Sequence, residues 1–356
     1  MASRTIGPRT LPTRTAALVA FALAICATWS TVGVAASDAP AAELKVSVAS
    51  GPTLPLGHAA DRWTRLLIAS GDTRLAAKLN PGASLSGRDA SREFAAVKDG
   101  GADLAVGSAL QWSLQVPALG VYTLPWIAPD ERSLQALVDD EPLRAALAAR
   151  LDAQGVVLVA IGALGHREIA TSTRAIRGPG DVKGLRLRVS ASPMLHETFL
   201  ALGAMPQAMP FAAAQAALAS GALDGQEGTP AALAAARIGA GGQRHLTAWG
   251  AIADAMVFAI RKPLWESLSE PQREIVRRSA QQAIGETGAS SRQQAATRRL
   301  AENGMAIVRI TAAGHEAFRA EVGSVYERWR GAIGTDIVEL AEKALAAAPA
   351  APPKGS

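Results

Sequence analysis

The segment LRLRV at residues 185–189 places two arginines within a short apolar stretch. Side chains of an extended strand alternate between two faces, so Arg186 and Arg188 share one face and the apolar residues share the other. A guanidinium group matches a carboxylate in a bidentate geometry that an ammonium group cannot reproduce. The pattern therefore indicates either a carboxylate-binding site or surface arginines that pair with acidic side chains.

Residues suited to catalysis are not grouped in this sequence. It contains no nucleophile-elbow, zinc-peptidase or P-loop motif, and its five histidines are scattered without metal-ligand spacing. Asp224 and Glu227 lie in a glycine-flanked segment that we expect to be a loop. Two carboxylates in one loop do not form a glycosidase pair, which must face each other across a sugar. We expect no enzymatic activity, no metal ion and no cofactor.

Composition and charge favour an exported α/β protein over a nucleic-acid-binding one. The 356 residues are 49% hydrophobic and carry a formal net charge of +5. Part of this charge comes from Arg4, Arg9 and Arg14, within a segment that we expect to be removed. Because no dense basic run is interleaved with aromatic residues, we expect no nucleic-acid partner.

The first 36 residues have the order of a secretory signal peptide. Basic residues precede an apolar run at 16–27, and small residues at 34–36 offer a cleavage site. An uncleaved anchor is the alternative, but the run is shorter than the ~20 residues of a spanning helix. The one cysteine, Cys26, lies in this segment, so the mature protein would contain no disulfide. We expect the product in the periplasm.

Hydrophobic patterns predict alternating strands and helices, an arrangement that implies parallel pairing with right-handed crossovers. In the first part of the chain, the expected strands are 44–49, 74–79, 103–107 and 156–161, and the expected helices are 57–69, 88–98 and 134–151. In the second part, we expect a strand at 185–189, helices at 194–202 and 212–220, and a returning strand at 251–260. A long helix is expected from Ser269 to about Glu302.

These elements predict two α/β domains joined by crossing segments. Domain I comprises 43–164 and 250–268, domain II comprises 165–249, and 269–345 supplies the long helix and segments that pack on both. The tail at 346–356 is expected to be disordered. Ligands of open α/β sheets lie at the carboxyl ends of strands, so we expect a ligand cleft between the domains that closes by hinge motion.

Three ordered motifs resemble one family of binding proteins. They are DVKGLRLRV at 181–189, GAMPQAMPF at 203–211 and ALASGALDGQE at 217–227. Supporting similarities lie in GHREIATSTRAI at 165–176 and LWESLSEPQREIV at 264–276. Together they resemble the solute-binding subunit of tripartite ATP-independent periplasmic (TRAP) transporters, of the dicarboxylate-binding (DctP) type. The resemblance extends from Leu44 to about Leu340.

The resemblance implies a two-domain periplasmic binding protein fold and a function in transport. Such a protein, expected here as a monomer, captures a small organic acid and delivers it to the small and large TRAP membrane subunits. The family's carboxylate-binding arginine corresponds to Arg188, a second donor to Arg167 and a pocket aromatic residue to Phe211. The alternatives are a binding protein for an ATP-driven importer or a sensor, and a periplasmic hydrolase.

Further candidates line the expected cleft. Gln111 and Trp112 follow a strand at its carboxyl end, and Trp249 lies near a crossing segment. Gly228 stands where the family has a ligand-binding asparagine, and Ala213 and Gln215 replace its usual glutamate and tyrosine. We expect these departures to change the polar groups of the pocket and to leave room for a larger or more apolar acid.

Overall fold

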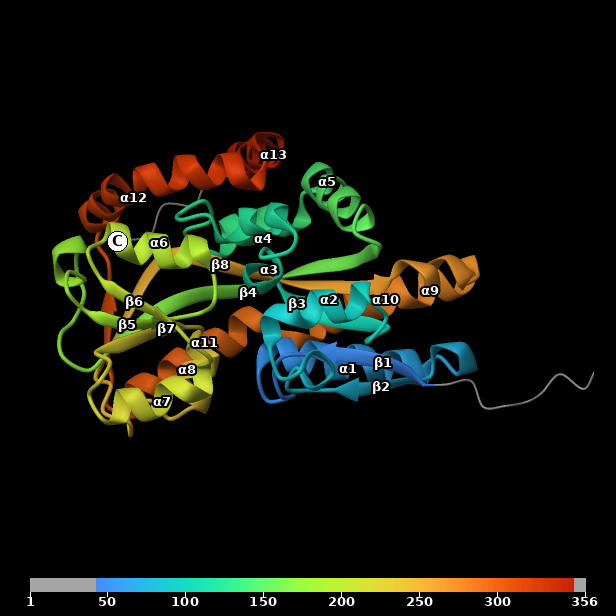
Figure 1. The fold of residues 1–356 in the computed structure, drawn as a ribbon, viewed down its shortest axis with the longest axis horizontal. Helices are drawn as coiled ribbons and strands as arrows, with labels where there is room; N and C mark the ends of the chain where they lie inside the picture. Colours follow the sequence, from blue (N-terminus) through green and yellow to red (C-terminus); the bar gives the residue numbers. More distant parts are fainter. Residues whose placement is uncertain (1–42, 349–356) are drawn as a thin grey trace, which may run out of the picture. The chain divides into compact units, whose positions relative to one another are not determined.

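The structure is a computed structural model in which residues 43–348 are described (Figure 1). The predicted signal peptide lies outside these residues, and so does most of the predicted tail. Ala346 and Ala347, the first tail residues, belong to the last helix. No helix in the described part of the chain is long and apolar enough to cross a membrane.

Nine strands form one mixed sheet in the order β2-β1-β3-β8-β4-β7-β5-β6, with β9 beside β8. The strands are β1 Leu44–Val48, β2 Ala77–Asn80, β3 Leu104–Ser108, β4 Val156–Thr171, β5 Arg186–Val189, β6 Met205–Ala208, β7 Gly225–Gly228, β8 His245–Arg261 and β9 Ala306–Arg309. The α-helices are α1 Pro55–Ala69, α2 Glu93–Lys98, α3 Ala109–Trp112, α4 Glu131–Asp139, α5 Glu141–Asp152, α6 Pro193–Ala201, α7 Phe211–Ala219, α8 Pro230–Ala235, α9 Lys262–Ser267, α10 Glu270–Thr287, α11 Ala289–Glu302, α12 Ala312–Ile333 and α13 Thr335–Ala347.

The sheet extends through two lobes, which confirms the predicted two-domain α/β fold. In the first lobe β1 pairs in parallel with β2 and β3, and in the second β5 pairs in parallel with β6 and β7. The long antiparallel strands β4 and β8 run through both lobes (Figure 1). The domain boundaries predicted near Gly165 and Gly250 therefore fall inside strands rather than in linkers.

Several predicted elements differ in their bounds. The predicted strand at 74–79 begins as a 3-10 turn, Thr73–Leu75, before β2. The helix predicted at 134–151 is two helices, because Asp140 ends α4 and its carboxylate caps α5 by accepting from Leu143 N at 2.8 Å. The segment expected as a loop around Glu227 is the buried strand β7, which finds partners in β4 and β5.

The predicted long helix is present as α10 and α11, which meet at Gly288 with a φ of 53°. In the first lobe, the Trp63 indole of α1 donates to Ser279 Oγ of α10 at 3.1 Å. In the second lobe, Gln293 Oε1 of α11 accepts from Ala231 N of α8 at 2.9 Å. The two helices thus connect the lobes, as predicted.

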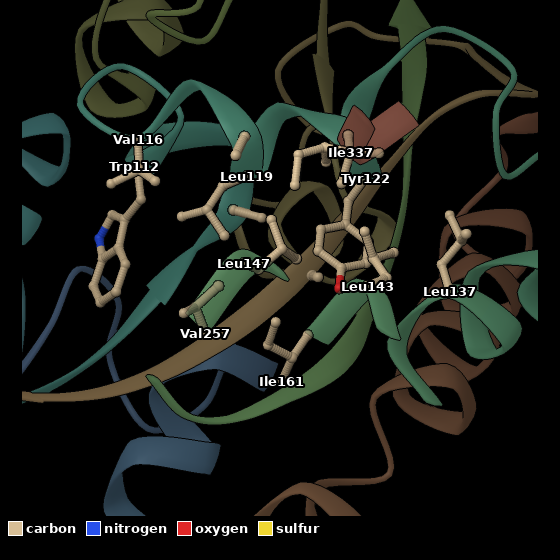
Figure 2. Packing of buried hydrophobic residues seen from close by; sticks show 14 of the residues in the cluster. Trp112, Val116, Leu119, Tyr122, Leu137, Leu143, Leu147, Ile161, Val257 and Ile337 are labelled. Carbon is tan, nitrogen blue, oxygen red and sulfur yellow. The ribbon is translucent and has the colours of Figure 1, made fainter. Parts of the chain in front are cut away.

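A large hydrophobic core fills the first lobe between the sheet and the helices α4, α5 and α13. Figure 2 shows Trp112, Tyr122 and Leu147 within this core, with Ile337 of α13 beside them. Trp112 packs against Gly107 so closely that a Cβ at that glycine would lie 1.9 Å from the indole ring. Only glycine therefore fits at this position of β3.

One carboxyl group is enclosed in the first lobe. Glu93, at the start of α2, accepts a hydrogen bond from Ser47 Oγ at 2.8 Å. Burial raises the pKa of Glu93 from 4.5 to about 8, although the Ser47 hydrogen bond opposes this shift. Glu93 is therefore protonated in the folded protein at neutral pH.

This group makes stability depend on pH. Between pH 4.5 and about 8 the folded chain holds a proton on Glu93 that the unfolded chain releases. Its contribution is full below this window and is lost as pH rises through it, by about 1.4 kcal/mol per pH unit. Urea denaturation between pH 5 and 8 should show that Glu93→Gln flattens this dependence, whereas exposed Glu302→Gln retains the full slope. A Glu93→Gln variant with the parent slope would contradict the assignment.

Candidate functional site

A buried carboxylate lies between two arginines at the carboxyl end of β7. The Glu227 side chain is 1% exposed, and its Oε2 accepts a hydrogen bond from Arg167 Nε at 2.5 Å. Its Oε1 accepts from Ser190 N at 2.7 Å and lies 3.5 Å from Arg188 Nη1. Burial opposes ionisation of Glu227, but the two guanidinium groups outweigh it and lower its pKa to about 2. Glu227 is therefore a fixed negative charge.

Arg188, predicted to meet a ligand, is buried rather than on an open surface. It is 5% exposed, and its Nε donates to Met209 O at 2.9 Å. Its guanidinium carbon lies 5.5 Å from the centre of the Phe211 ring, so the two predicted site residues are in contact. Register pairing between β5 and β7 places Arg188 beside Gln226 and brings its guanidinium to Glu227.

Arg167 connects this cluster to the first lobe. Its Nη2 donates to Ser190 Oγ at 2.8 Å, and its Nη1 lies 3.7 Å from Asp254 Oδ2. Asp254, on β8, is fully buried and accepts from Ser108 Oγ at 2.7 Å and from Leu110 N at 3.1 Å. A chain of polar contacts therefore crosses from the end of β3 in one lobe to the ends of β5 and β7 in the other.

The topology explains why these residues meet. Ser108, Ser190 and Gly228 lie at or just past the carboxyl ends of β3, β5 and β7, where ligands of open α/β sheets bind. Arg167 and Asp254 lie on β4 and β8, the two strands shared by the lobes. The site is thus assembled where the lobes join, and both arginines can present donors to an anion there.

Two predicted cleft residues belong to the hydrophobic interior, which corrects those predictions. Trp112 is fully buried in the first-lobe core, edge-on to Phe94. Trp249, on β8 beside β4, is buried, stacks on Phe199, and its indole donates to Arg167 O at 2.8 Å. Gln111 is half-buried at the start of α3 beside Ser108, and its ligand role stays a prediction.

The family asparagine position does not leave open space here. A Cβ built on Gly228 would lie 3.2 Å from Leu233 Cδ2, and Leu233 is fully buried in the second lobe. The room expected beside Gly228 is therefore filled by Leu233 of α8. Gln215, which replaces the family tyrosine, donates to Gln226 Oε1 at 3.2 Å and so stabilises β7.

Sequence reasoning did not identify Ser108, Ser190 or Asp254, and it noted Glu227 only as a carboxylate in an expected loop. Asp254 did leave a signal, because it is a lone acidic residue within the apolar run AIADAMVFAI of β8. A buried acid of this kind requires a charged or hydrogen-bonding partner. Which partner it has depends on pairing between distant strands.

A hollow of about 390 Å³ lies beside β4, lined by Glu131, Arg132, Leu134, Gln135, Ala163, Gly165, His166, Glu168, Pro230, Ser290, Gln293, Gln294 and Thr297. His166 and Glu168 point into it, whereas Arg167 between them contacts the charged cluster. Its amides are already engaged, since Gln293 bonds to Leu164 O and Gln294 to Glu131. The arginine cluster around Glu227 therefore remains the candidate ligand site.

No arrangement of three or more histidine, cysteine or acidic side chains suited to a metal ion occurs among residues 43–348. The charged groups at the site are two guanidiniums and two carboxylates. Such a donor set suits the recognition of an organic anion by hydrogen bonds.

Comparisons with known proteins point the same way. The model of the bacterial extracellular solute-binding protein family 7 (DctP) matches residues 46–331. A TRAP periplasmic solute-binding protein from Ralstonia eutropha H16, solved with bound (S)-2-acetolactate, is 41% identical with a TM-score of 0.79, over 85% of this chain and 98% of that chain. A Shewanella oneidensis TRAP protein with bound succinate shares the fold at 23% identity and a TM-score of 0.76, over 85% of this chain and 99% of that chain.

Curated relatives align over shorter stretches. The 2,3-diketo-L-gulonate-binding periplasmic protein of Escherichia coli is 28% identical over 48% of this chain and 51% of its own length. The C4-dicarboxylate-binding periplasmic protein of Rhodobacter capsulatus is 29% identical over 44% of this chain and 46% of its own length. The chain thus spans about half the length of these curated relatives.

Removing the Glu227 carboxylate should destabilise the folded protein. Glu227→Ala leaves two buried guanidiniums without their shared partner, and we expect a loss of about 3–5 kcal/mol in the free energy of unfolding at pH 7. Because the pKa of Glu227 is lowered to about 2, the contribution of its charge is present above its unfolded value and is lost as pH falls toward 2.

Denaturant unfolding at pH 7 and at pH 3 would measure both effects. The matched control is Glu286→Gln, which removes a carboxylate from the exposed pair with Arg62 and should cost less than about 1 kcal/mol. Equal losses in the two variants would show that Glu227 does not hold the site together.

The packing at Gly228 gives a second prediction. Gly228→Asn should force Leu233 to move and cost about 1–3 kcal/mol, because the added Cβ is tightly placed. Thermal unfolding of the single and double variants can measure this competition. Gly228→Asn should cost less stability when it is introduced into Leu233→Ala than when it is introduced into the wild-type protein. Purely additive losses would mean that the two residues do not compete for space.

Proposed function

Because the chain belongs to the bacterial extracellular solute-binding protein family 7, we propose that it captures a small organic acid and delivers it to a TRAP-type membrane transporter. The supporting observation is the pair Arg167 and Arg188, held with their guanidiniums around Glu227 where the lobes join. Family 7 is a family of binding proteins, and we propose that this member performs no catalysis.

The hydrogen bonds of the arginines suit an incoming carboxylate. Nε of Arg188 and both Nε and Nη2 of Arg167 are bonded to other residues, which fixes the two guanidinium planes. Arg188 Nη2 and Arg167 Nη1 form no hydrogen bond within the described residues, so their N–H groups remain for a ligand. Fixed donors of this kind lose little conformational entropy on binding.

We propose a short acid with one carboxylate as the ligand class. Two guanidiniums are balanced by Glu227 and Asp254 before the ligand arrives, so an acid with one negative charge disturbs this balance less than a dianion. The relative from Ralstonia, which is 41% identical, holds the small monocarboxylate (S)-2-acetolactate. The Phe211 ring under Arg188 offers an apolar contact for the carbon chain of such an acid.

We further propose export and a membrane partner. The signal peptide predicted at residues 1–36 would place the chain in the periplasm. The small and large TRAP subunits would then recognise the surface formed when the two lobes close on the acid. The strands β4 and β8, which both lobes share, are the connection about which such closure would occur.

The role of Arg188 can be tested by isothermal titration calorimetry with acids selected in a thermal-shift screen. Arg188→Ala removes a buried guanidinium from the ligand, and we expect affinity to fall by about 30-fold to several thousand-fold. Arg188→Lys should also bind poorly, because one ammonium group cannot replace the planar fork.

The matched control is Arg186→Ala, two residues earlier on the same strand. Arg186 is part-exposed and pairs with Asp224, away from the charged cluster, so we expect less than about a threefold change in affinity. Unchanged affinity in Arg188→Ala would remove the site assignment, and a screen in which no organic acid raises the melting temperature would reject the proposed function.

A further inference from the structure

The single hydroxyl proton of Ser108 is already used in a hydrogen bond. Ser108 lies at the end of β3, and its Oγ is 2.7 Å from Asp254 Oδ2. When Asp254 is ionised, its carboxylate can only accept, so Ser108 is the donor in this hydrogen bond. Ser108 Oγ also receives a long contact, 3.4 Å, from Gln111 N. Ser108 Oγ can therefore only accept a further hydrogen bond.

The groups around Asp254 are those that an ionised carboxylate requires. Its Oδ1 accepts from Leu110 N at 3.1 Å, and its Oδ2 faces Arg167 Nη1 at 3.7 Å. The pKa of Asp254 is raised overall, because burial outweighs Arg167 and the hydrogen bonds from Ser108, Leu110 and Ala255, which all lower it. The surroundings thus supply two hydrogen-bond donors and one cation, a set that stabilises a carboxylate.

Ser108 is also close to the proposed ligand carboxylate. Asp254 Oδ2 lies 2.7 Å from Ser108 Oγ and 3.7 Å from Arg167 Nη1, so the hydroxyl and the guanidinium are neighbours of the same carboxylate oxygen. An acid whose carboxylate binds the arginines would bring the substituent on its second carbon toward Ser108. A hydroxyl substituent can donate to Ser108 Oγ, whereas a carbonyl oxygen would face an atom that offers only lone pairs.

We propose that Ser108 and Asp254 make this site selective for 2-hydroxy acids over the corresponding 2-oxo acids. Ser108 contacts the ligand, and Asp254 is a positioning residue that fixes the direction of the Ser108 proton. This inference rests on the proposed function, because it takes the carboxylate to lie on Arg167 and Arg188. It adds which polar group on the acid is recognised.

The selectivity can be measured with matched probes that differ only at the second carbon. The pairs are lactate and pyruvate, 2-hydroxyisovalerate and 2-oxoisovalerate, and gluconate and 2-oxogluconate, with each lactate and hydroxyisovalerate enantiomer titrated separately at pH 8. For every pair that binds, we expect the better hydroxy enantiomer to bind at least tenfold more tightly than the oxo acid. The reason is that the oxo acid loses one hydrogen bond to the buried acceptor Ser108 Oγ.

Two substitutions separate this role from a structural one. Asp254→Asn places an amide N–H opposite Ser108 Oγ, which frees the Ser108 proton to point toward the ligand, so the preference should reverse in favour of the oxo acid. Ser108→Ala should bring the ratio within a pair to about one. Ser113→Ala, which removes a hydroxyl just past the end of α3 bonded to Leu110 O at 2.7 Å, is the matched control and should keep the wild-type ratio.

The outcomes are distinct. Equal affinity for hydroxy and oxo acids in the wild-type protein, or a wild-type ratio retained in Ser108→Ala, would overturn the inference while carboxylate binding stands. If Asp254→Asn does not fold, the wild-type and Ser108→Ala ratios decide alone. If Arg188→Ala leaves the binding of every acid unchanged, the site assignment fails, and this inference fails with it. If no organic acid binds the wild-type protein, the proposed function fails as well.

Discussion

The site depends on one buried carboxylate placed between two guanidiniums. Glu227 is the shared partner of Arg167 and Arg188, and without it two like charges would lie together in a region largely closed to water. Burying ions is costly unless each one is paired and hydrogen-bonded, and Glu227 meets this condition with Ser190 N as a further donor. The same contacts that make burial tolerable also fix both arginines in one orientation. Folding and the proposed anion recognition would therefore be consequences of a single arrangement.

The arrangement also ties the lobes together. Arg167 lies on β4 and Asp254 on β8, and these strands belong to both lobes, so the polar contacts cross the connection from Ser108 to Glu227. A ligand that binds Arg167 would compete with Asp254, whose 3.7 Å separation from Nη1 is too long for a good hydrogen bond. Binding would then be felt in both lobes at once, which is what a closing motion requires.

The sequence predicted the arginine site better than its surroundings. Strand alternation and ordered motifs identified Arg188, Arg167 and Phe211, which the structure brings together around β5, β4 and α7. Ser108 and Asp254 could not be paired in advance, because their contact follows from the antiparallel alignment of β3 with β8, residues far apart in the chain. Trp112 and Trp249 were misplaced for a related reason. A strand's carboxyl end gives the position of a residue, but core packing decides which way a large indole points.

Trp249 then has a different importance from the one first expected. Its indole donates to Arg167 O and its backbone N–H donates to the Glu168 carboxylate. One residue of β8 therefore holds two consecutive residues of β4 in place. Phe199 and Trp126 pack on the same ring and restrict its movement. Backing of this kind keeps the Arg167 guanidinium in place before any ligand arrives, which lowers the entropy lost on binding. In the proposed site, aromatic packing in the interior would thus contribute to recognition without contacting the ligand.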